Sequence, residues 1–321
     1  MTHRKEGQEK AQGPIVTGFS RLPIFRVCGG SDASRGEFVR RLMTELPARA
    51  LTGFFLRRSD GNTPYTLTLL ARRYDLVLVN SDVEAADQPI TLVAYAERDN
   101  GESPWLVSEA EGLPSLLSRF LEKLSECCLR TPVWACVLIG GKSSRMGRPK
   151  HLIKDKEGRT WLENTIATLR PLVDGIVVSG GGVLPESLAD TLRLPDIPGV
   201  SGPLTGILAA GRWQPLVSWL LVACDMPQVS AEAVTWLLAD RRPGCWGRVP
   251  KFAGNKRLEP LLAWYDFRSM LLFEEQLYTR NLRIGESAGD SRIDHPVISE
   301  ELCRSWENIN TPEQLQKVQE R

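Results

Sequence analysis

The sequence predicts an α/β fold in two domains, a larger Rossmann-like domain with a mostly parallel sheet and a smaller α/β domain before it. Three observations predict this. Apolar strand-like runs alternate with helix-like stretches, which is the pattern of βαβ units. The length of 321 residues exceeds that of a typical single core. The segment 129–132 ends in Pro132 and interrupts a helical pattern, so it marks the domain boundary.

The first domain is expected at 21–130, after a polar, flexible tail at 1–20. Its strand-like runs are Ile24–Cys28, Leu76–Val79 and Thr91–Ala94. Its helix-like stretches are Glu37–Leu46 and Leu113–Leu124. This alternation predicts a small α/β unit.

The second domain is expected at 131–321, and its alternation predicts parallel βαβ units. The strand-like runs are Val133–Ile139, Gly175–Ser179 and Trp219–Cys224. Helix starts carry capping signals: Thr160 with Glu163 forms a capping box before 164–170, and Thr311 is followed by Pro312 and Gln314. A further helical pattern runs over 204–211.

The loop from Leu138 to Lys150 predicts a binding site for a nucleoside triphosphate. Gly140 and Gly141 directly follow an apolar strand, so the chain can turn sharply and expose backbone N–H groups to phosphate oxygens. Loops at the carboxyl ends of strands are where open α/β sheets bind ligands. Three cations are available to neutralise the phosphates: Lys142, Arg145 and Lys150. The alternative is a glycine-rich surface turn with solvated basic residues.

Asp225 is a candidate Mg²⁺ ligand. It ends the apolar strand Trp219–Cys224, and Pro227 then stops the strand, so the carboxylate is expected at the carboxyl edge of the sheet. One carboxylate is sufficient, because Mg²⁺ keeps several waters and takes other ligands from phosphate oxygens. The alternative is that Asp225 only caps the following turn.

Asp196 lies in a long loop, 194–206, that proline and glycine punctuate. Long loops in compact folds are often functional, and its carboxylate offers an acceptor pair for a ribose or a guanine edge. Taken alone, Asp196 also suits an ordinary turn.

Composition excludes several classes of protein. A formal charge of +1 with 25% charged residues argues against a general nucleic-acid binder. The seven scattered cysteines form no disulfide or zinc pattern, which fits a reducing cytosol. The polar start has no signal-peptide core, and no apolar stretch is long enough to span a bilayer. We therefore expect a soluble, cytoplasmic protein with no membrane and no nucleic-acid partner.

From 133 to 321 the sequence resembles the molybdenum cofactor guanylyltransferase family, one of the wider nucleotidyltransferases. The resemblance rests on these segments: the loop 138–150, Asp196, 202–206, 224–227, 259–263 and 308–313. It implies transfer of GMP from GTP to molybdenum-molybdopterin, giving molybdopterin guanine dinucleotide and pyrophosphate with Mg²⁺ present.

The resemblance also implies roles for individual residues. The nucleotide would be bound by Leu138, Ile139, Gly140, Gly141, Lys150, Ser179, Asp196 and Asp225. The catalytic groups would be Arg145, Lys150 and Asp225, with Asp225 also the metal ligand. Ser179 stands where many relatives have Asn, which weakens the assignment at that position.

Such a reaction asks for cations and positioning rather than for a nucleophilic side chain, because the attacking phosphate is already ionised. His151 is then simply a neighbour of Lys150. Four basic residues are candidates for the pterin phosphate, or equally for a solvated basic hairpin: Arg248, Lys251, Lys256 and Arg257.

The first domain carries an altered phosphate loop. In a frame that begins at Gly29, Ser34 replaces the second glycine, Arg35 the lysine and Gly36 the metal-binding hydroxyl residue. Residues 24–128 resemble a degenerate, P-loop-like copy of the GTP-binding adaptor of the same pathway, with Asn80-Ser81-Asp82 where Glu-Gly-Phe is usual. A structural or docking role is therefore expected in preference to GTP hydrolysis.

Two other classes of function stay open. The enzymatic alternative is a cytidylyltransferase on the same cofactor or a sugar-phosphate nucleotidyltransferase, although Gly140-Gly141 favours guanine over the Ala-Gly of cytidylyl relatives. The other is a non-catalytic nucleotide-binding protein or chaperone of molybdoenzyme maturation. Besides GTP and molybdopterin, molybdoenzyme apoproteins or their chaperones are candidate partners.

Overall fold

The computed structural model describes residues 22–57, 63–81, 90–94, 113–140 and 146–319, so the predicted tail at 1–20 lies outside it. The chain forms two compact units. The first contains the described residues up to Thr131 together with Arg241–Trp246, and the second contains Pro132–Asp240 and the chain from Gly247 onward.

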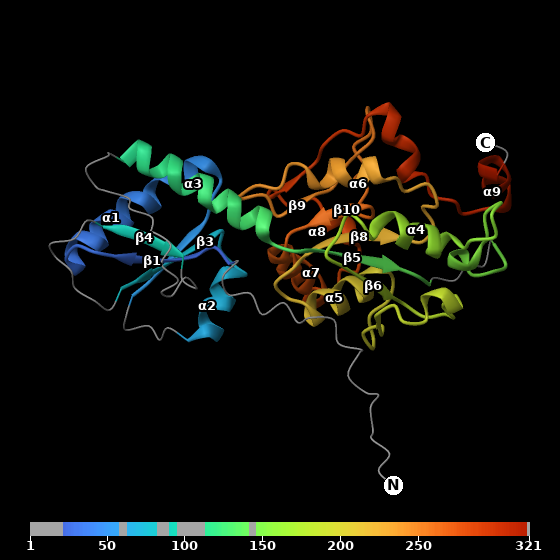
Figure 1. Cartoon of the computed structure of the whole chain (residues 1–321), viewed down its shortest axis with the longest axis horizontal. Helices are drawn as coiled ribbons and strands as arrows, with labels where there is room; N and C mark the ends of the chain where they lie inside the picture. Colours follow the sequence, from blue (N-terminus) through green and yellow to red (C-terminus); the bar gives the residue numbers. More distant parts are fainter. Residues whose placement is uncertain (1–21, 58–62, 82–89, 95–112, 141–145, 320–321) are drawn as a thin grey trace, which may run out of the picture. The chain divides into compact units, whose positions relative to one another are not determined.

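The first unit contains a four-stranded sheet (Figure 1). Its order is β2 (Gly53–Leu56), β3 (Leu76–Asn80), β1 (Ile24–Cys28) and β4 (Thr91–Ala94). The first three are parallel, whereas β4 pairs antiparallel with β1. The strands expected at 24–28 and 91–94 are confirmed, and the strand expected at Leu76 ends one residue later than predicted.

Among its described residues, three α-helices accompany this sheet: α1 (Asp32–Glu45), α2 (Pro64–Ala71) and α3 (Leu113–Arg130). Helix α1 begins five residues earlier than predicted, because Ser31 Oγ accepts a hydrogen bond from the N–H of Ser34 at 3.1 Å and caps it. Helix α3 continues six residues beyond the predicted stretch Leu113–Leu124 and ends at Arg130, so the helical pattern stops inside the segment 129–132, two residues before Pro132. Residues of α1 and α3 share one apolar core with Phe25, whose ring meets that of Phe120 edge-on at 5.2 Å.

The second unit contains a seven-stranded mixed sheet. Its order is β11 (Ile293–Asp294), β9 (Gly247–Arg248), β10 (Ala263–Tyr265), β8 (Ser218–Ala223), β5 (Val133–Leu138), β6 (Gly175–Ser179) and β7 (Arg193–Leu194). The pairs among β5, β6, β7 and β8 are parallel, and β10 is antiparallel to both of its neighbours. The three predicted strands are confirmed within one residue at their ends.

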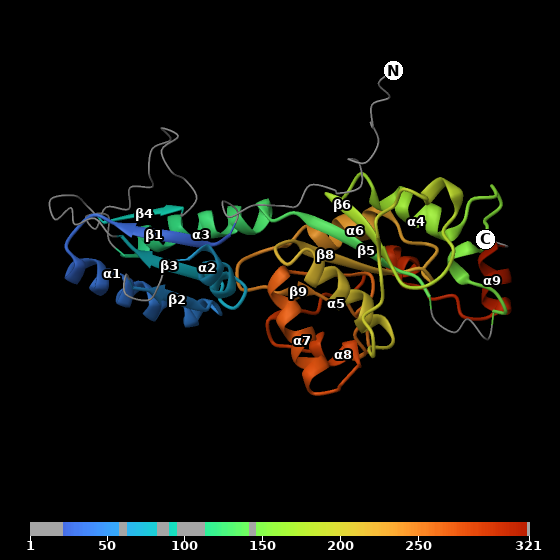
Figure 2. The same cartoon turned by 90° about the horizontal axis from the view of Figure 1, so that it is seen from below.

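Helices cover both faces of this sheet, as Figure 2 shows: α4 and α6 lie on one face, and α5, α7 and α8 on the other. Their bounds, with those of α9, are α4 (Trp161–Leu169), α5 (Pro203–Trp213), α6 (Ala231–Leu238), α7 (Met270–Tyr278), α8 (Ile284–Ser287) and α9 (Pro312–Gln319). The capping box of Thr160 and Glu163 is confirmed, as is the cap of Thr311 and Gln314. The chain is therefore an α/β protein with mostly parallel, mixed sheets.

Strand register brings separate parts of the sequence to one edge of the second sheet. Leu138, at the end of β5, is paired with Ser179 at the end of β6 and with Ala223 at the end of β8. Because these strands are parallel, the chain leaves the sheet at the same edge after each of them. Within the described part of the chain, no helix combines the length and apolar character that crossing a membrane needs.

Candidate active site

A cavity of about 780 Å³ opens at this edge of the second sheet. It is lined by Leu138, Ile139, Gly140, Lys150, Ser179, Gly181, Asp196, Val200, Ser201, Gly202, Pro203, Thr205, Gly206, Ala223, Cys224, Asp225, Leu261 and Asn308. The structure thus brings the predicted site residues from five separate stretches of sequence into one cavity. Gly141, Lys142 and Arg145, which are also predicted to act at the site, lie outside the described residues.

The floor of the cavity is a close contact between two strand-end turns. Gly140 has φ +111° and approaches Gly181, while Gly180 has φ +118°. A Cβ atom on Gly180 would lie 1.8 Å from the carbonyl oxygen of Ile139, so only glycine fits there. The sequence reasoning missed this second turn, although three consecutive glycines after a strand are a readable signal.

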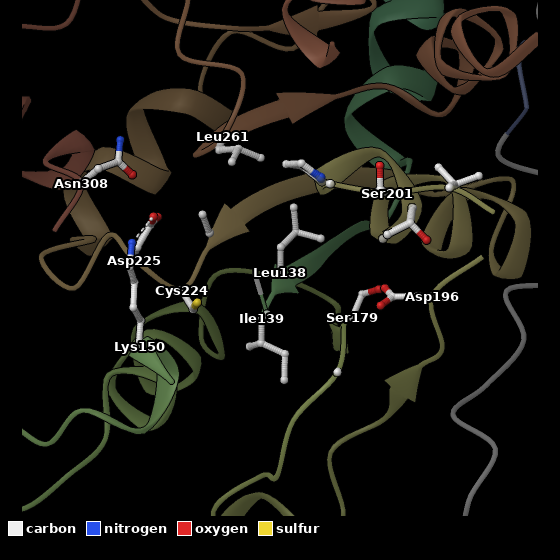
Figure 3. Close-up of a pocket in the computed structure, with 18 residues that line it drawn as sticks. Leu138, Ile139, Lys150, Ser179, Asp196, Ser201, Cys224, Asp225, Leu261 and Asn308 are labelled. Atoms are coloured by element: carbon white, nitrogen blue, oxygen red, sulfur yellow. Dashed lines mark hydrogen bonds and ion pairs between the residues drawn. The ribbon is translucent and has the colours of Figure 1, made fainter. Parts of the chain in front are cut away.

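One end of the cavity carries a cation and a carboxylate that face each other. Figure 3 shows Lys150 and Asp225 joined by a dashed line, and Nζ lies 3.1 Å from Oδ2. Lys150 Nζ also donates to Oδ1 of Asn310 at 2.7 Å. The two charged side chains are only 13% and 25% exposed, so their attraction is less screened than that of a surface pair.

A segment near the carboxyl end of the chain completes this end of the cavity. The N–H of Ile309 donates to the backbone oxygen of Asp225 at 2.9 Å, which brings Asn308 and Asn310 to the site. Both asparagines fall in the segment 308–313, which carries part of the family resemblance but predicts no role for either of them. The sequence feature that could have identified them is two asparagines on either side of one apolar residue, directly before a capped helix.

The opposite end of the cavity presents a hydroxyl and a carboxylate. In Figure 3, Leu138 and Ile139 are drawn between Lys150 on one side and Ser179 and Asp196 on the other. Ser179 is 1% exposed, and its Oγ has no hydrogen-bond partner among the described residues. The loop that carries Asp196 is fixed by the N–H of Ile197, which donates to Thr205 Oγ1 at 2.6 Å. A buried hydroxyl without a partner is costly, so this end is suited to a polar ligand.

Cys224 lines the cavity beside Asp225 but is unsuited to nucleophilic chemistry. Burial, with a smaller contribution from the neighbouring carboxylate, raises the pKa of its thiol to about 12. The reactive thiolate is therefore scarce near neutral pH. This agrees with the expectation that the chemistry needs no side-chain nucleophile.

The four basic residues considered for an acceptor phosphate do not line the cavity. Arg248 is 7% exposed and donates to the backbone oxygen of Trp236 at 2.9 Å, with its guanidinium 5.4 Å from that ring's centre. Arg248 therefore has a structural role, and its guanidinium is not placed to bind a phosphate in the cavity. Lys256 and Arg257 are exposed. His151 is buried, and its Nε2 lies 3.0 Å from the oxygen of Val183, which ties the Lys150 segment to the glycine turn.

In the first unit, Arg35 occupies the altered phosphate loop. Its side chain is 2% exposed and donates to the carbonyl oxygens of Gly29 and Gly30, at 3.3 and 2.8 Å, and to Asn80 Oδ1 at 2.7 Å. A phosphate loop turns N–H groups toward an anion. Here the turn instead directs carbonyl oxygens at the chain's own cation.

The second unit combines a mostly parallel sheet, a cavity at the carboxyl edge of its strands, a paired lysine and a strand-end aspartate. This is the layout of a nucleotide-binding α/β domain. Residues 135–306, just over half of the chain, match the family described as MobA-like NTP transferase domain. The chain belongs to this family, and the family match shows that the domain is a nucleotidyltransferase.

Individual relatives match the same part of the chain. The probable molybdenum cofactor guanylyltransferase of Pelotomaculum thermopropionicum is 31% identical over 190 residues, which cover 57% of this chain and 89% of the relative. The molybdenum cofactor guanylyltransferase of Sinorhizobium fredii is 33% identical over 215 residues, covering 58% and 90%. Among solved structures, the molybdopterin-guanine dinucleotide biosynthesis protein A of Archaeoglobus fulgidus aligns with a TM-score of 0.46 and 24% identity over 58% of this chain and 97% of that one.

Proposed function

We propose that this chain transfers GMP from GTP to molybdenum-molybdopterin and so forms molybdopterin guanine dinucleotide and pyrophosphate. The observation that carries the proposal is the two-ended cavity. Lys150 and Asp225 lie at one end, Ser179 and Asp196 at the other, and an apolar wall separates them. That layout suits a nucleotide, whose phosphates and base need opposite chemistry. The names of the relatives support guanylyl transfer to this cofactor.

Lys150 would bind the phosphates. Its ammonium group is held by Asp225 and Asn310 before any substrate arrives. A triphosphate would draw it away from these partners, and its charge would then stabilise negative charge that develops on the leaving pyrophosphate. Positioning of this kind requires no proton transfer, because the attacking phosphate of the acceptor is already largely ionised near neutral pH.

The residues at this end fit a Mg²⁺ ion. Lys150 donates to Oδ2 of Asp225, and no described residue donates to its Oδ1. No cluster of three or more His, Cys, Asp or Glu side chains occurs among the described residues, which argues against a dedicated protein cage such as a zinc site. A single hard carboxylate beside a triphosphate is the donor set that Mg²⁺ accepts. When bound, the ion would neutralise phosphate charge, and Asp225 would hold it.

The base and ribose would occupy the opposite end. The carboxylate of Asp196 can accept two hydrogen bonds, as the N–H groups of a guanine edge require. The unpartnered hydroxyl of Ser179 can donate or accept, so a ligand would satisfy it. Because Ser179 is buried, a ligand that left its hydroxyl unpaired would lose affinity, which would make binding at this end selective.

The test is to incubate the protein with molybdenum-loaded molybdopterin, Mg²⁺ and either GTP or CTP, and to measure pyrophosphate. Release with GTP alone is the expected result. Release with CTP but not GTP would reject the guanine assignment in favour of a cytidylyltransferase. No release with either nucleotide would favour a nucleotide-binding or chaperone protein.

For the first unit we propose a P-loop-like domain, over about 21–130, with a structural or docking role beside a transferase domain at 131–321. The self-contained hydrogen bonding of Arg35 supports this role over GTP hydrolysis. Molybdoenzyme apoproteins or their chaperones are the proposed docking partners, and the cytoplasm is the proposed location.

A further inference from the structure

The carboxamide of Gln314 lies at the centre of a hydrogen-bonded turn that leads into the cavity. Its Oε1 accepts from the N–H of Asn310 at 2.6 Å and from that of Thr311 at 3.2 Å. Thr311 Oγ1 accepts in return from the N–H of Gln314 at 3.3 Å. This reciprocal pairing satisfies N–H groups at the start of α9 and fixes the backbone on both sides of Thr311.

The turn that Gln314 fixes holds Lys150 and Asp225, the two charged residues at one end of the cavity. The N–H of Ile309 binds the backbone oxygen of Asp225 at 2.9 Å, and Asn310 Oδ1 accepts from Lys150 Nζ at 2.7 Å. Two adjacent residues therefore hold the charged pair: Ile309 binds the backbone of Asp225, and the side chain of Asn310 binds the ammonium group of Lys150.

Helix α9 has its own apolar anchor. Leu315 is 7% exposed and packs in a small cluster with Met146, Ile153, Trp161 and Ile309. Because the cluster joins the helix to residues on both sides of Lys150 in the sequence, α9 has a fixed base from which Gln314 can act.

We infer that Gln314 is a positioning residue for nucleotidyl transfer, which holds Lys150 beside Asp225 through Asn310. The inference rests on the proposed function for the identity of the reaction. Gln314 is exposed and does not line the cavity, so it acts through Asn310 and does not touch substrate. A lysine side chain has much rotamer freedom. If it is fixed before binding, less conformational entropy is lost when a polyphosphate binds.

Three variants test this inference. Gln314→Met keeps the length of the side chain and removes the acceptor, whereas Gln314→Glu keeps an acceptor in place. Lys317→Met is the matched control, because Lys317 is exposed on the same helix and lies outside the cavity lining. The readouts are affinity for inorganic tripolyphosphate with Mg²⁺, kcat and KM for GTP, and amide hydrogen exchange at Ile309 and Asn310.

In Gln314→Met we expect faster exchange at both amides and a loss of about tenfold in tripolyphosphate affinity and in kcat/KM, the size of effect that one hydrogen bond gives. Gln314→Glu should recover wild-type values within about twofold, and Lys317→Met should match the wild type. Faster exchange with unchanged affinity and turnover would show that the cap is only structural and would overturn the inference, as would unchanged exchange.

The two proposals fail in different ways. A wild-type chain that binds tripolyphosphate but consumes neither GTP nor CTP refutes the proposed function, and tripolyphosphate affinity then decides the role of Gln314 alone. A wild-type chain that does not bind tripolyphosphate overturns both.

Discussion

Lys150 Nζ lies 3.1 Å from Oδ2 of Asp225, and the pair is held at one end of the cavity by residues from the far end of the chain. The ammonium therefore has oxygen partners before any substrate binds, and the cavity is electrically balanced at this end. A triphosphate that brings its own cation offers a new partner to each member of the pair. The ion pair is thus a resting arrangement that substrate binding would replace.

The first prediction concerns this pair. Lys150→Ala and Asp225→Asn should each lower kcat/KM for GTP by about 100-fold, or about 3 kcal/mol of transition-state stabilisation, as loss of one preorganised electrostatic group does. Because the two side chains are in contact, the double variant should lose less than the sum. Pyrophosphate release measures the rates, and Lys156→Ala, at an exposed position outside the cavity, is the control. Near-normal turnover in either single variant would refute the assigned role.

The second prediction concerns the close approach of α5 to the strand ends. A Cβ atom at Gly206 would lie 2.5 Å from Leu138 Cδ2 and 2.8 Å from Ser179 Oγ, both in the cavity lining. Gly206→Ala should push these side chains toward the nucleotide, raise KM for GTP about tenfold and cost about 1–3 kcal/mol of stability. Gly36→Ala is the control, because nothing lies within 4 Å of a Cβ there, and it should be neutral or stabilising. An unchanged KM in Gly206→Ala would contradict this prediction. It would show that the ends of β5 and β6 shift to accommodate the methyl group without changing nucleotide binding.

The third prediction concerns acid stability. Hydrogen bonds from the Ser187 hydroxyl, and then from the hydroxyl and N–H of Thr160, lower the pKa of Glu163 from 4.5 to about 2. The ionised carboxylate therefore stabilises the folded state above pH 4.5, and this contribution is lost as the pH falls toward 2. Glu163→Gln keeps the capping box but removes the charge, so the free energy of unfolding should depend less on pH between 4.5 and 2.

Urea unfolding at several pH values measures this dependence. Glu157→Gln, at an exposed position, is the control. An identical pH profile in Glu163→Gln and the wild type would contradict the assignment of the acid transition to this carboxylate.

The local features of the fold were predictable because they depend on neighbours in sequence. The capping box of Thr160 and Glu163, and the strands that end at Leu138 and Ser179, follow from short-range patterns. The antiparallel strand β10 could not be predicted from such patterns, because three residues give little periodic signal and strand direction is a tertiary property.

A site residue that directly follows a strand could be predicted from the sequence. A site residue that only tertiary folding brings to the cavity was much harder to predict. Asp225 could be placed at the sheet edge from its strand alone. Asn310 lies 160 residues from Lys150, and only the folded chain shows that the two touch. From the sequence, Arg248 is a phosphate candidate because it is one of four basic residues around Gly247 and Gly254, but tertiary packing buries it over Trp236.

The fourth prediction concerns Cys224. With the pKa of its thiol raised to about 12, alkylation by iodoacetamide should be slow near neutral pH even though the residue lines the cavity. Cys224→Ala should keep turnover within about fivefold, because the reaction needs no thiolate. Mass spectrometry during turnover should show no covalent nucleotidyl adduct. Loss of all activity in Cys224→Ala, with the fold intact by circular dichroism, would reopen a covalent mechanism.

The last prediction concerns Arg35 in the first unit. Arg35→Met would leave the acceptors at Gly29, Gly30 and Asn80 without their donor, and should cost about 3 kcal/mol of stability because these groups are buried or partly buried. Arg40→Met is the matched control: Arg40 pairs with Glu37 on the exposed surface of α1, where solvent screens the pair, so its loss should leave stability nearly unchanged. Chemical denaturation measures both. At a temperature where the variants are folded, GTP turnover should match the wild type if the first unit only supports or docks. Lost turnover in folded Arg35→Met, with Arg40→Met unaffected, would instead give the first unit a part in the reaction.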